Sequence, residues 1–467
     1  MIEFQHGGSG VMKKMTEGKI VPQLFLFSLP LVLGSILQLT YNLFDYIIMG
    51  WFSADPINSQ AALSIAGPIF NIFISLISGL CVGLAIHTSQ LFGTGDECSL
   101  KKQFTSCLIV FGIFSLGLTV LFNLLLTPIM AISNVTDPTL KYDAMVYLGI
   151  TSLGLVFSFL YNMYASYLRA LGDSLASLIF LAISCVLNIV LNIVFVAQFK
   201  MEIAGVALST LISQVLSAIL IMIYGKLRYK TLLVLSPKEY VIDGPLLKIS
   251  TGYAVASAMQ QIVLYVGKYA ISTQINKFDA YYIAAFGGAS KLDDFVFAPG
   301  QNFGHATSIF VAQNRGAGNK ERCKRGYLTG FGLNLIYGVL ISITIALLRR
   351  PVFNLFIGSD VVDRELVVDS GVLYLSIMCF LYILPCITNS IQSFFRGMGK
   401  LNMVFYSTTV QIVVRVVSMF VLVACSVGPM QSAAFSTMIG WIAMICFEAP
   451  FLVYNWKHFD KFLPKIE

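Results

Sequence analysis

One acidic residue lies in the middle of the first long apolar segment of this 467-residue chain. The segment covers residues 21–52, and the acid is Asp45. A carboxylate near the centre of a lipid bilayer costs roughly 2.5–3.5 kcal/mol on insertion scales. An acid kept at such a cost usually binds an ion or a proton, so Asp45 is the first candidate for a functional residue.

Other polar residues follow the helical spacing of this acid. Gln38, Asn42 and Asp45 are placed at i, i+4 and i+7, on one face of a helix. Asn188 and Asn192 are placed at i, i+4 in a later apolar segment. Amide and hydroxyl oxygens around a carboxylate can bind sodium, and low-dielectric surroundings can equally keep a proton on the acid. The alternative role for the two asparagines is hydrogen bonding between helices.

Pro30 lies 15 residues before Asp45 in the same segment. Proline removes a backbone hydrogen bond and bends a membrane helix. Fifteen residues of straight helix span about 22 Å, so Pro30 is too far from Asp45 to bind the same cation. We therefore expect Pro30 to act as a hinge that responds when the charge on Asp45 changes.

Three charged residues share another apolar segment. Lys291 and Asp294 are placed at i, i+3, which predicts that they neutralise each other, and Asp293 lies between them. A role for Lys291, Asp293 and Asp294 in lining a cavity is the second interpretation. His87 and His305 can relay protons, but hydrogen-bonded structural histidines are the more common case.

The composition is that of a membrane protein. Of all residues, 57% are hydrophobic and 11% are charged, whereas soluble domains carry about 25% charged residues. The net charge of +7 does not indicate nucleic-acid binding, because the basic residues flank apolar segments. The nine cysteines show no C-x-x-C spacing, so neither metal binding nor disulfides are expected. Motifs for ATP binding, serine hydrolysis or zinc proteolysis do not occur, and we expect neither enzymatic activity nor a cofactor.

Twelve segments are long enough to cross a bilayer as helices, which requires about 20 residues. Their approximate limits are 22–52, 60–92, 103–128, 139–168, 175–198, 202–224, 246–275, 280–313, 327–348, 366–395, 402–425 and 431–454. An even number places both termini on one side of the membrane. That side carries 21 flanking basic residues against six on the other, which predicts that it is the cytoplasmic side.

Two short elements occur twice. Gln90–Asp96 (QLFGTGD) returns as Gln313–Asn319 (QNRGAGN), and Arg169–Asp173 (RALGD) returns as Arg396–Lys400 (RGMGK). The offsets are 223 and 227 residues, and each element ends an apolar segment. The repeats predict two six-helix halves, 15–235 and 236–467. Residues 1–14 are expected to be an N-terminal extension, because MTEGK at Met15 looks like a natural start. Repeats of this kind usually place a substrate cavity between the halves.

Together these features resemble the multidrug and toxic compound extrusion (MATE) family. The resemblance lies in MTEGK at Met15 before an S-L-P segment, in Gly287–Gly300 leading to Val311–Asn319, and in the repeated elements. It covers essentially residues 15–460. It implies an all-α membrane protein with twelve transmembrane helices, located in the bacterial cell membrane and acting as a monomer among lipids.

The resemblance also implies where the coupling cation binds. In one branch of the family the acids lie in the seventh and tenth helices. Here the seventh segment has no acid between Ser250 and Asn276, and in the tenth segment Pro385 stands about where the acid would fall. The branch similar to the DNA-damage-inducible F (DinF-like) members has its site in the N-terminal half. Its pattern corresponds here to Pro30, Asp45, Tyr147, Asn188, Asn192 and Thr210. Asn192 replaces a second aspartate, so sodium and a proton both stay open, with the proton favoured.

The predicted function is a cation-coupled antiporter that exports amphipathic, often cationic, drug-like compounds. One alternative is a flippase for lipid-linked precursors from the same wider superfamily, which the twelve segments and the residues around Asp45 disfavour. Another is a receptor or channel without coupled transport. A channel would show a ring of charges or a selectivity filter, which the sequence does not contain.

Overall fold

The computed structural model describes residues 15–132, 137–229, 232, 241–358 and 363–462. The predicted extension 1–14, the predicted border at residues 235 and 236, and the side chain of Asn42 lie outside the described residues. The described helices are α1 (Ile20–Phe52), α2 (Pro56–Thr94), α3 (Glu97–Ile132), α4 (Pro138–Ser152), α5 (Leu155–Ala170), α6 (Ser174–Ile193), the π-helical turn η1 (Val194–Gln198), α7 (Glu202–Arg228), α9 (Gly244–Ile275), α10 (Ala280–Gly316), α11 (Lys320–Asn354), α12 (Arg364–Met378), α13 (Ile383–Gly397), α14 (Leu401–Ala424), α15 (Pro429–Lys457) and the 3-10 turn η3 (Phe459–Phe462).

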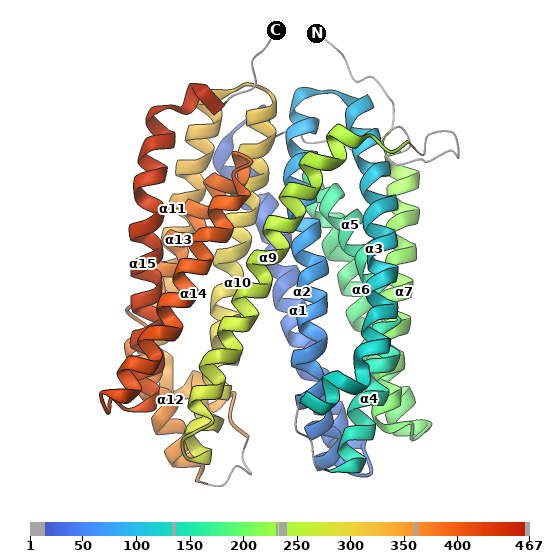
Figure 1. The fold of residues 1–467 in the computed structure, drawn as a ribbon, viewed down its shortest axis with the longest axis vertical. Coiled ribbons are helices and arrows are strands. Elements are labelled where there is room, and N and C mark those ends of the chain that lie inside the picture. The colour runs from blue at the N-terminus through green and yellow to red at the C-terminus, as the bar shows by residue number, and fades with distance from the viewer. Residues whose placement is uncertain (1–14, 133–136, 230–231, 233–240, 359–362, 463–467) are drawn as a thin grey trace.

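The helices run roughly along the long axis of the molecule (Figure 1). Eight of the described helices are each long and apolar enough to cross a membrane, and the bent pairs α4–α5 and α12–α13 bring the number to ten. Helices α9 and α10, with 32 and 37 residues, are long enough to cross a membrane but lack a stretch as continuously apolar as those of the other ten. The prediction of an all-α membrane protein with twelve transmembrane helices is confirmed.

The helices form two halves, α1–α7 and α9–α15. In the first half α1 packs against α6, and α2 packs against α4 and α5. In the second half α14 packs against α15, and α10 packs against α11 and α13. The halves meet where α2 packs against α9 and α10 and where α1 packs against α10. Two of the four helices at this junction, α9 and α10, are the two long helices without such an apolar stretch.

The predicted fourth and tenth segments are each two helices instead of one. Helices α4 and α5 meet at 45°, and α12 and α13 meet at 54°. At the first break, a Cβ on Gly154 would lie 1.9 Å from Oε1 of Gln214, so the neighbouring helix α7 approaches the backbone closely there. At the second break, Pro385 is the third residue of α13, and its missing N–H suits the start of a helix.

The two repeated elements adopt the same local structure. Gly95 and Gly318 have φ angles of +80° and +70°, and Gly172 and Gly399 have +91° and +73°. Glycine occupies this left-handed region without a steric penalty and commonly ends helices. The repeats therefore end α2 and α10, and α5 and α13, in matching ways.

Both ends of the described chain lie at the same end of the bundle, which we call the termini end (Figure 1). The backbone oxygen of Met15 accepts a hydrogen bond from Nε of Arg322 at 2.9 Å. Lys320 lies in the first turn of α11, as Arg322 does, and forms an ion pair of 2.6 Å with Asp460 near the other end of the chain. The opposite end of the bundle is called the far end below.

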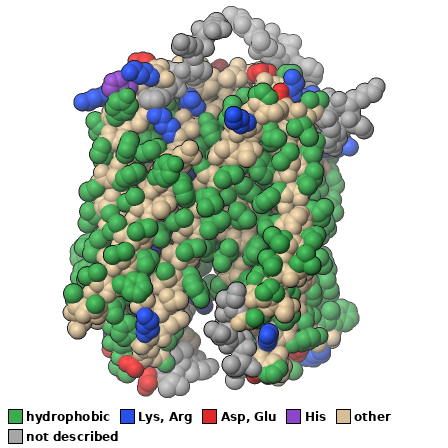
Figure 2. Space-filling view, viewed as in Figure 1, with side chains coloured by type: hydrophobic (Ala, Val, Ile, Leu, Met, Phe, Trp, Pro, Cys, Tyr) green, Lys and Arg blue, Asp and Glu red, His purple; other side chains and the backbone are tan. Residues whose placement is uncertain are grey.

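The surface fits a lipid environment. Figure 2 shows hydrophobic side chains over the middle of the visible face and charged side chains mainly near the two ends. Leu124 and Leu347 are 73% and 76% exposed on the outer helices α3 and α11. Water would disfavour so much exposed apolar area, whereas lipid does not.

Candidate functional site

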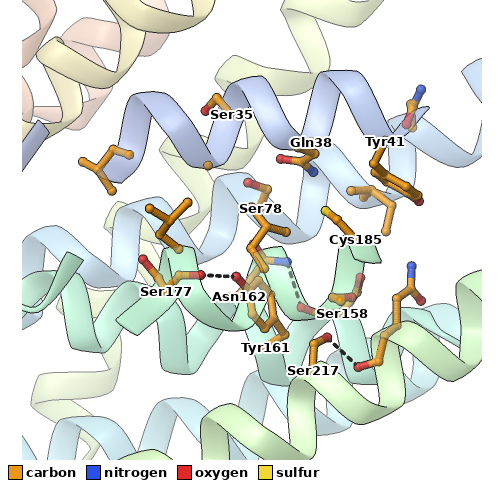
Figure 3. A pocket seen from close by; sticks show the side chains of 18 of the residues that line it. Ser35, Gln38, Tyr41, Ser78, Ser158, Tyr161, Asn162, Ser177, Cys185 and Ser217 are labelled. Carbon is orange, nitrogen blue, oxygen red and sulfur yellow. Dashed lines mark hydrogen bonds between the residues drawn. The ribbon is translucent and has the colours of Figure 1, made fainter. Parts of the chain in front are cut away.

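A cavity of about 690 Å³ lies mainly within the first half and reaches the face of α10 (Figure 3). Most of its wall comes from α1, α2, α5, α6 and α7. Its volume falls in the range of about 300–1,000 Å³ that is typical of sites for drug-sized molecules.

Much of the cavity wall is polar. Figure 3 shows Ser35, Gln38 and Tyr41 on α1, with Ser158 and Asn162 of α5 on the other side of the view. The Nδ2 atom of Asn162 donates to the backbone oxygen of Ser158 at 2.8 Å, so its Oδ1 stays available to a ligand. Amide and hydroxyl groups of this kind can orient a bound molecule by hydrogen bonding.

Asp45 is hydrogen-bonded to other residues of the predicted site. Nδ2 of Asn192 donates to Oδ1 of Asp45 at 2.7 Å and to Oδ1 of Asn188 at 3.1 Å. Nδ2 of Asn188 in turn donates to Oγ1 of Thr210 at 3.3 Å. All four residues are buried, with at most 6% of each side chain exposed. The structure thus brings residues from α1, α6 and α7 into one hydrogen-bonded chain.

The helical periods of the sequence explain this arrangement. Asn188 and Asn192 are one helical turn apart on α6, so they face the same neighbours, and α6 packs against both α1 and α7. The π-helical turn η1 follows directly after this part of α6. Such turns occur often at functional sites because they change the direction in which side chains point.

Two further predicted residues, Tyr147 and Pro30, lie on the cavity wall. Tyr147 of α4 is 7% exposed, and Pro30 of α1 lies in a helix that continues through it without interruption. Gln38 also lines the cavity.

Sequence reasoning missed Ser209, which completes the hydrogen-bonded chain. Its hydroxyl donates to Oδ1 of Asn192 and is fully buried. Asn192 therefore has both its oxygen and its nitrogen engaged, which fixes the amide group with its nitrogen toward Asp45. The signal that could have found it is the spacing of four between Ser209 and Ser213, which marks a polar face on α7.

The charged residues of α10 are arranged differently from the prediction. Asp294 forms an ion pair of 2.5 Å with Lys268 of α9 instead of with Lys291. Asp293 does not line the cavity; its carboxylate accepts hydrogen bonds from the hydroxyls of Tyr374 at 2.7 Å and Tyr382 at 2.8 Å. An acid on α10 can pair with a lysine of the neighbouring helix α9 as easily as with a lysine of α10. The sequence alone does not show which of the two partners it takes.

Two cations on the cavity wall have no partner acid within the part of the chain that the structure describes. Lys291 lies over the ring of Tyr46, with 5.4 Å between Nζ and the ring centroid, and Arg169 donates to Oγ of Ser166 at 2.7 Å. Among the described residues, neither Lys291 nor Arg169 takes part in an ion pair. The cavity therefore carries Asp45 and two positive charges, besides the neutralised pair that Asp294 forms.

The fold and the cavity define a membrane protein of two six-helix halves, with a drug-sized cavity mainly in the first half. The family model MatE matches residues 30–194 and 256–421, one block in each half. The chain belongs to this family.

Several known proteins are similar to the chain. It is 30% identical over 310 residues to a probable multidrug resistance protein, YpnP, of Bacillus subtilis (strain 168), covering 66% of this chain and 68% of that protein. It is 24% identical over 341 residues to an FAD transporter of Shewanella oneidensis, covering 70% and 73%. The solved outward-facing conformation of a multidrug resistance MATE family transporter superposes with a TM-score of 0.87 at 19% identity, covering 98% of this chain and all of the other. That structure shares the fold.

The hydrogen bonds around Asn192 generate a prediction about stability. Asn192→Leu keeps the approximate volume but leaves the carboxylate of Asp45, Oδ1 of Asn188 and the hydroxyl of Ser209 without this partner. Each buried group that loses its partner costs about 1–3 kcal/mol. We expect a clearly lower melting temperature of the purified protein in detergent.

Ser209→Ala is the matched control, since it removes one donor and leaves Asp45 bonded. We expect a loss of about 1 kcal/mol from it. Equal melting temperatures for Asn192→Leu and the unmodified protein would show that this chain of hydrogen bonds does not hold α1, α6 and α7 together.

Proposed function

We propose that this protein is a cation-coupled antiporter that exports amphipathic, often cationic, organic compounds across the cell membrane. The observation that carries the proposal is one buried carboxylate, Asp45, on the wall of a drug-sized cavity inside a membrane protein. Membership of the MatE family and a similarity to a probable multidrug resistance protein support export as the direction and drug-like compounds as the cargo.

The coupling site in this proposal is Asp45 with Asn188, Asn192, Thr210 and Tyr147. A carboxylate can accept a proton or bind sodium, and the surrounding hydroxyl and amide oxygens can complete the sodium shell. The energy comes from an ion gradient, in which one charge gains about 2.3 kcal/mol per 100 mV. Asp45 and the bound compound share one cavity, so cation and compound compete, and competition of this kind makes exchange possible.

The proposal assigns the termini end to the cytoplasm, because most basic residues flank the membrane there. A cation then reaches Asp45 from the far end, removes its charge and lets α1 bend at Pro30, which narrows the space that the compound occupied. The halves 15–235 and 236–467 move against each other during the cycle. Each molecule works as a monomer, and nucleic acid has no part.

The first test removes the charge that couples the cation. Asp45→Asn keeps the shape and a hydrogen-bonding group but cannot be protonated or balance a cation. We expect normal expression and complete loss of dye efflux driven by an ion gradient in cells. Full efflux by the variant would refute the assignment of Asp45.

The control for this test lies in the second half. The double variant Asp293→Asn with Asp294→Asn removes two acids, of which Asp293 is off the cavity wall and Asp294 is already paired. We expect a smaller loss of efflux than from Asp45→Asn. The reverse order would move the cation site to the second half.

The second test distinguishes a proton from sodium. The site carries one formal charge, because an asparagine stands at position 192, and a single proton neutralises one carboxylate completely. We expect efflux in proteoliposomes with a pH gradient and without sodium, measured at a fixed membrane voltage. Transport that begins only when sodium is added on the uptake side would instead support a sodium site made by Asp45, Asn188, Asn192 and Thr210.

A second candidate function is the export of organic anions. The specific observation is that Lys291 and Arg169 lie on the cavity wall and form no ion pair with any described acid, so the described wall has more positive than negative charge. The similarity to a protein named as an FAD transporter is compatible with an anionic aromatic cargo. Lys291 over the ring of Tyr46 also presents a charge beside an aromatic face.

Removing Lys291 decides between the two kinds of cargo. If the cargo is anionic, Lys291→Met should weaken binding by on the order of 1 kcal/mol, or roughly fivefold, for a fluorescein anion and should not weaken binding of the cation ethidium. Lys277→Met is the control, because this lysine lies off the cavity wall and donates to Gln274. Unchanged fluorescein binding by Lys291→Met would leave the organic cation as the cargo class.

A further inference from the structure

The two repeated sequence elements meet each other at the termini end of the molecule. The QLFGTGD element ends α2 in the first half, and the QNRGAGN element ends α10 in the second, and these two helices pack together. The function proposed above assigns no role to either element. Each element makes the same two kinds of contact with the other half: one between backbones and one from a side chain to a backbone.

The backbone contact uses one glycine from each half. A Cβ added to Gly93 would lie 2.0 Å from the backbone oxygen of Gln313, and one added to Gly316 would lie 2.0 Å from the backbone oxygen of Gln90. No other residue type fits at this distance without moving the helices apart. The glycines stand at equal places in the two repeats, so the contact has approximate two-fold symmetry.

The side-chain contact uses one glutamine from each half. Nε2 of Gln313 donates to the backbone oxygen of Ala170 at 2.7 Å, and Nε2 of Gln90 donates to the backbone oxygen of Gly397 at 3.3 Å. Ala170 and Gly397 are the last residues of α5 and α13. The carbonyl groups at the end of a helix have no partner within it, so each glutamine supplies one from the opposite half.

The acceptor residues connect this contact to the cavity. Helices α5 and α13 are the second members of the two bent pairs, and α5 carries Ser158, Asn162 and Arg169 of the cavity wall. A movement of α5 that changes the cavity wall would therefore also change the hydrogen bond from Gln313 to the backbone oxygen of Ala170.

We propose that Gln90, Gly93, Gln313 and Gly316, with the carbonyls of Ala170 and Gly397, form a reciprocal latch that closes the route from the cavity to the termini end. The glutamines are positioning residues for transport, since they act on the helix ends and not on the cargo. The latch breaks as one unit when the halves separate at this end, because the four contacts share two helix ends. Its role in transport rests on the proposed function, but its existence does not.

The two sides of the latch differ in strength. Gln313 has the shorter bond to its carbonyl, and its Oε1 also accepts from the backbone nitrogen of Met15 at 3.0 Å. Oε1 of Gln90 accepts a long hydrogen bond, 3.5 Å, from the hydroxyl of Tyr253. Removal of Gln313 should therefore open the latch further than removal of Gln90.

Glycine substitutions test the latch without threatening the fold. Gly93→Ala and Gly316→Ala favour the helical state by themselves, since alanine is the better helix former, but they exclude the closed contact. Gly332→Ala and Gly117→Ala are matched controls on α11 and α3, where an added Cβ meets nothing within 4 Å. Hydrogen–deuterium exchange of the full-length protein in detergent reads out both ends of the molecule and needs no substrate.

We expect roughly fivefold faster exchange at the ends of α2 and α10 in Gly93→Ala and Gly316→Ala, the factor that corresponds to one lost hydrogen bond. Exchange at the far end, in the first turns of α2 and α10, should slow. When the two halves separate at the termini end, they approach each other at the far end and protect the helix ends there. The controls should behave as the unmodified protein. Gln313→Leu and Gln90→Leu should give the same pattern, with the larger effect from Gln313→Leu.

Two results would overturn the proposal. Unchanged exchange at the termini end in both glycine variants would show that the contact does not hold that end closed. Faster exchange at both ends would show a general loosening of the fold instead of a latch. The expected exchange pattern in the variants, together with no drug efflux by the unmodified protein, would count against the proposed function alone.

Discussion

The hydrogen bond from Asn192 to Asp45 is the interaction on which the organisation of the first half depends. A carboxylate within a membrane helix must find its partners inside the protein, because lipid offers none. Asn192 supplies one only if α6 lies against α1, and Ser209 fixes the asparagine only if α7 lies against α6. One charged group thereby connects three helices through hydrogen bonds, and it lies on the wall of the cavity. Chemistry and packing in this half therefore cannot be varied independently.

The sequence predicted the fold well because a bilayer imposes simple requirements. A helix must be about 20 residues long and apolar, and both properties can be counted in the sequence. The breaks within α4–α5 and α12–α13 were not predicted, because they depend on neighbours: Gln214 of α7 lies against Gly154, for example. A segment with uniform apolar composition gives no sign of such an approach. Pro385 stands out in the sequence because it occupies the place where an acid would fall in another branch of the family. In the structure, Pro385 lies at the start of α13.

For the candidate site, residues on one helix were easier to predict than partners on different helices. The spacing of Asn188 and Asn192 indicated a common face, and the structure places both in one hydrogen-bonded chain with Asp45 and Thr210. The partner of Asp294 was predicted on its own helix, where Lys291 stands at i+3, but it is Lys268 of α9. A spacing of three or four residues shows which side chains can contact each other on one helix. Which of several reachable partners is chosen depends on how the helices cross, and that information is spread over the whole chain.

The reciprocal contact between Gln90 and Gln313 has a consequence for how the two halves can differ. Each half offers both a donor and an acceptor to the other, as the subunits of a two-fold symmetric homodimer do across an isologous interface. Asp45 has no acidic counterpart: the positions 223 and 227 residues later are Lys268 and Ser272. At its closed end the chain thus behaves as a fused homodimer, and around the cavity as a fused heterodimer. A substitution at the junction affects contacts with both halves, whereas a substitution near Asp45 affects mainly contacts within the first half.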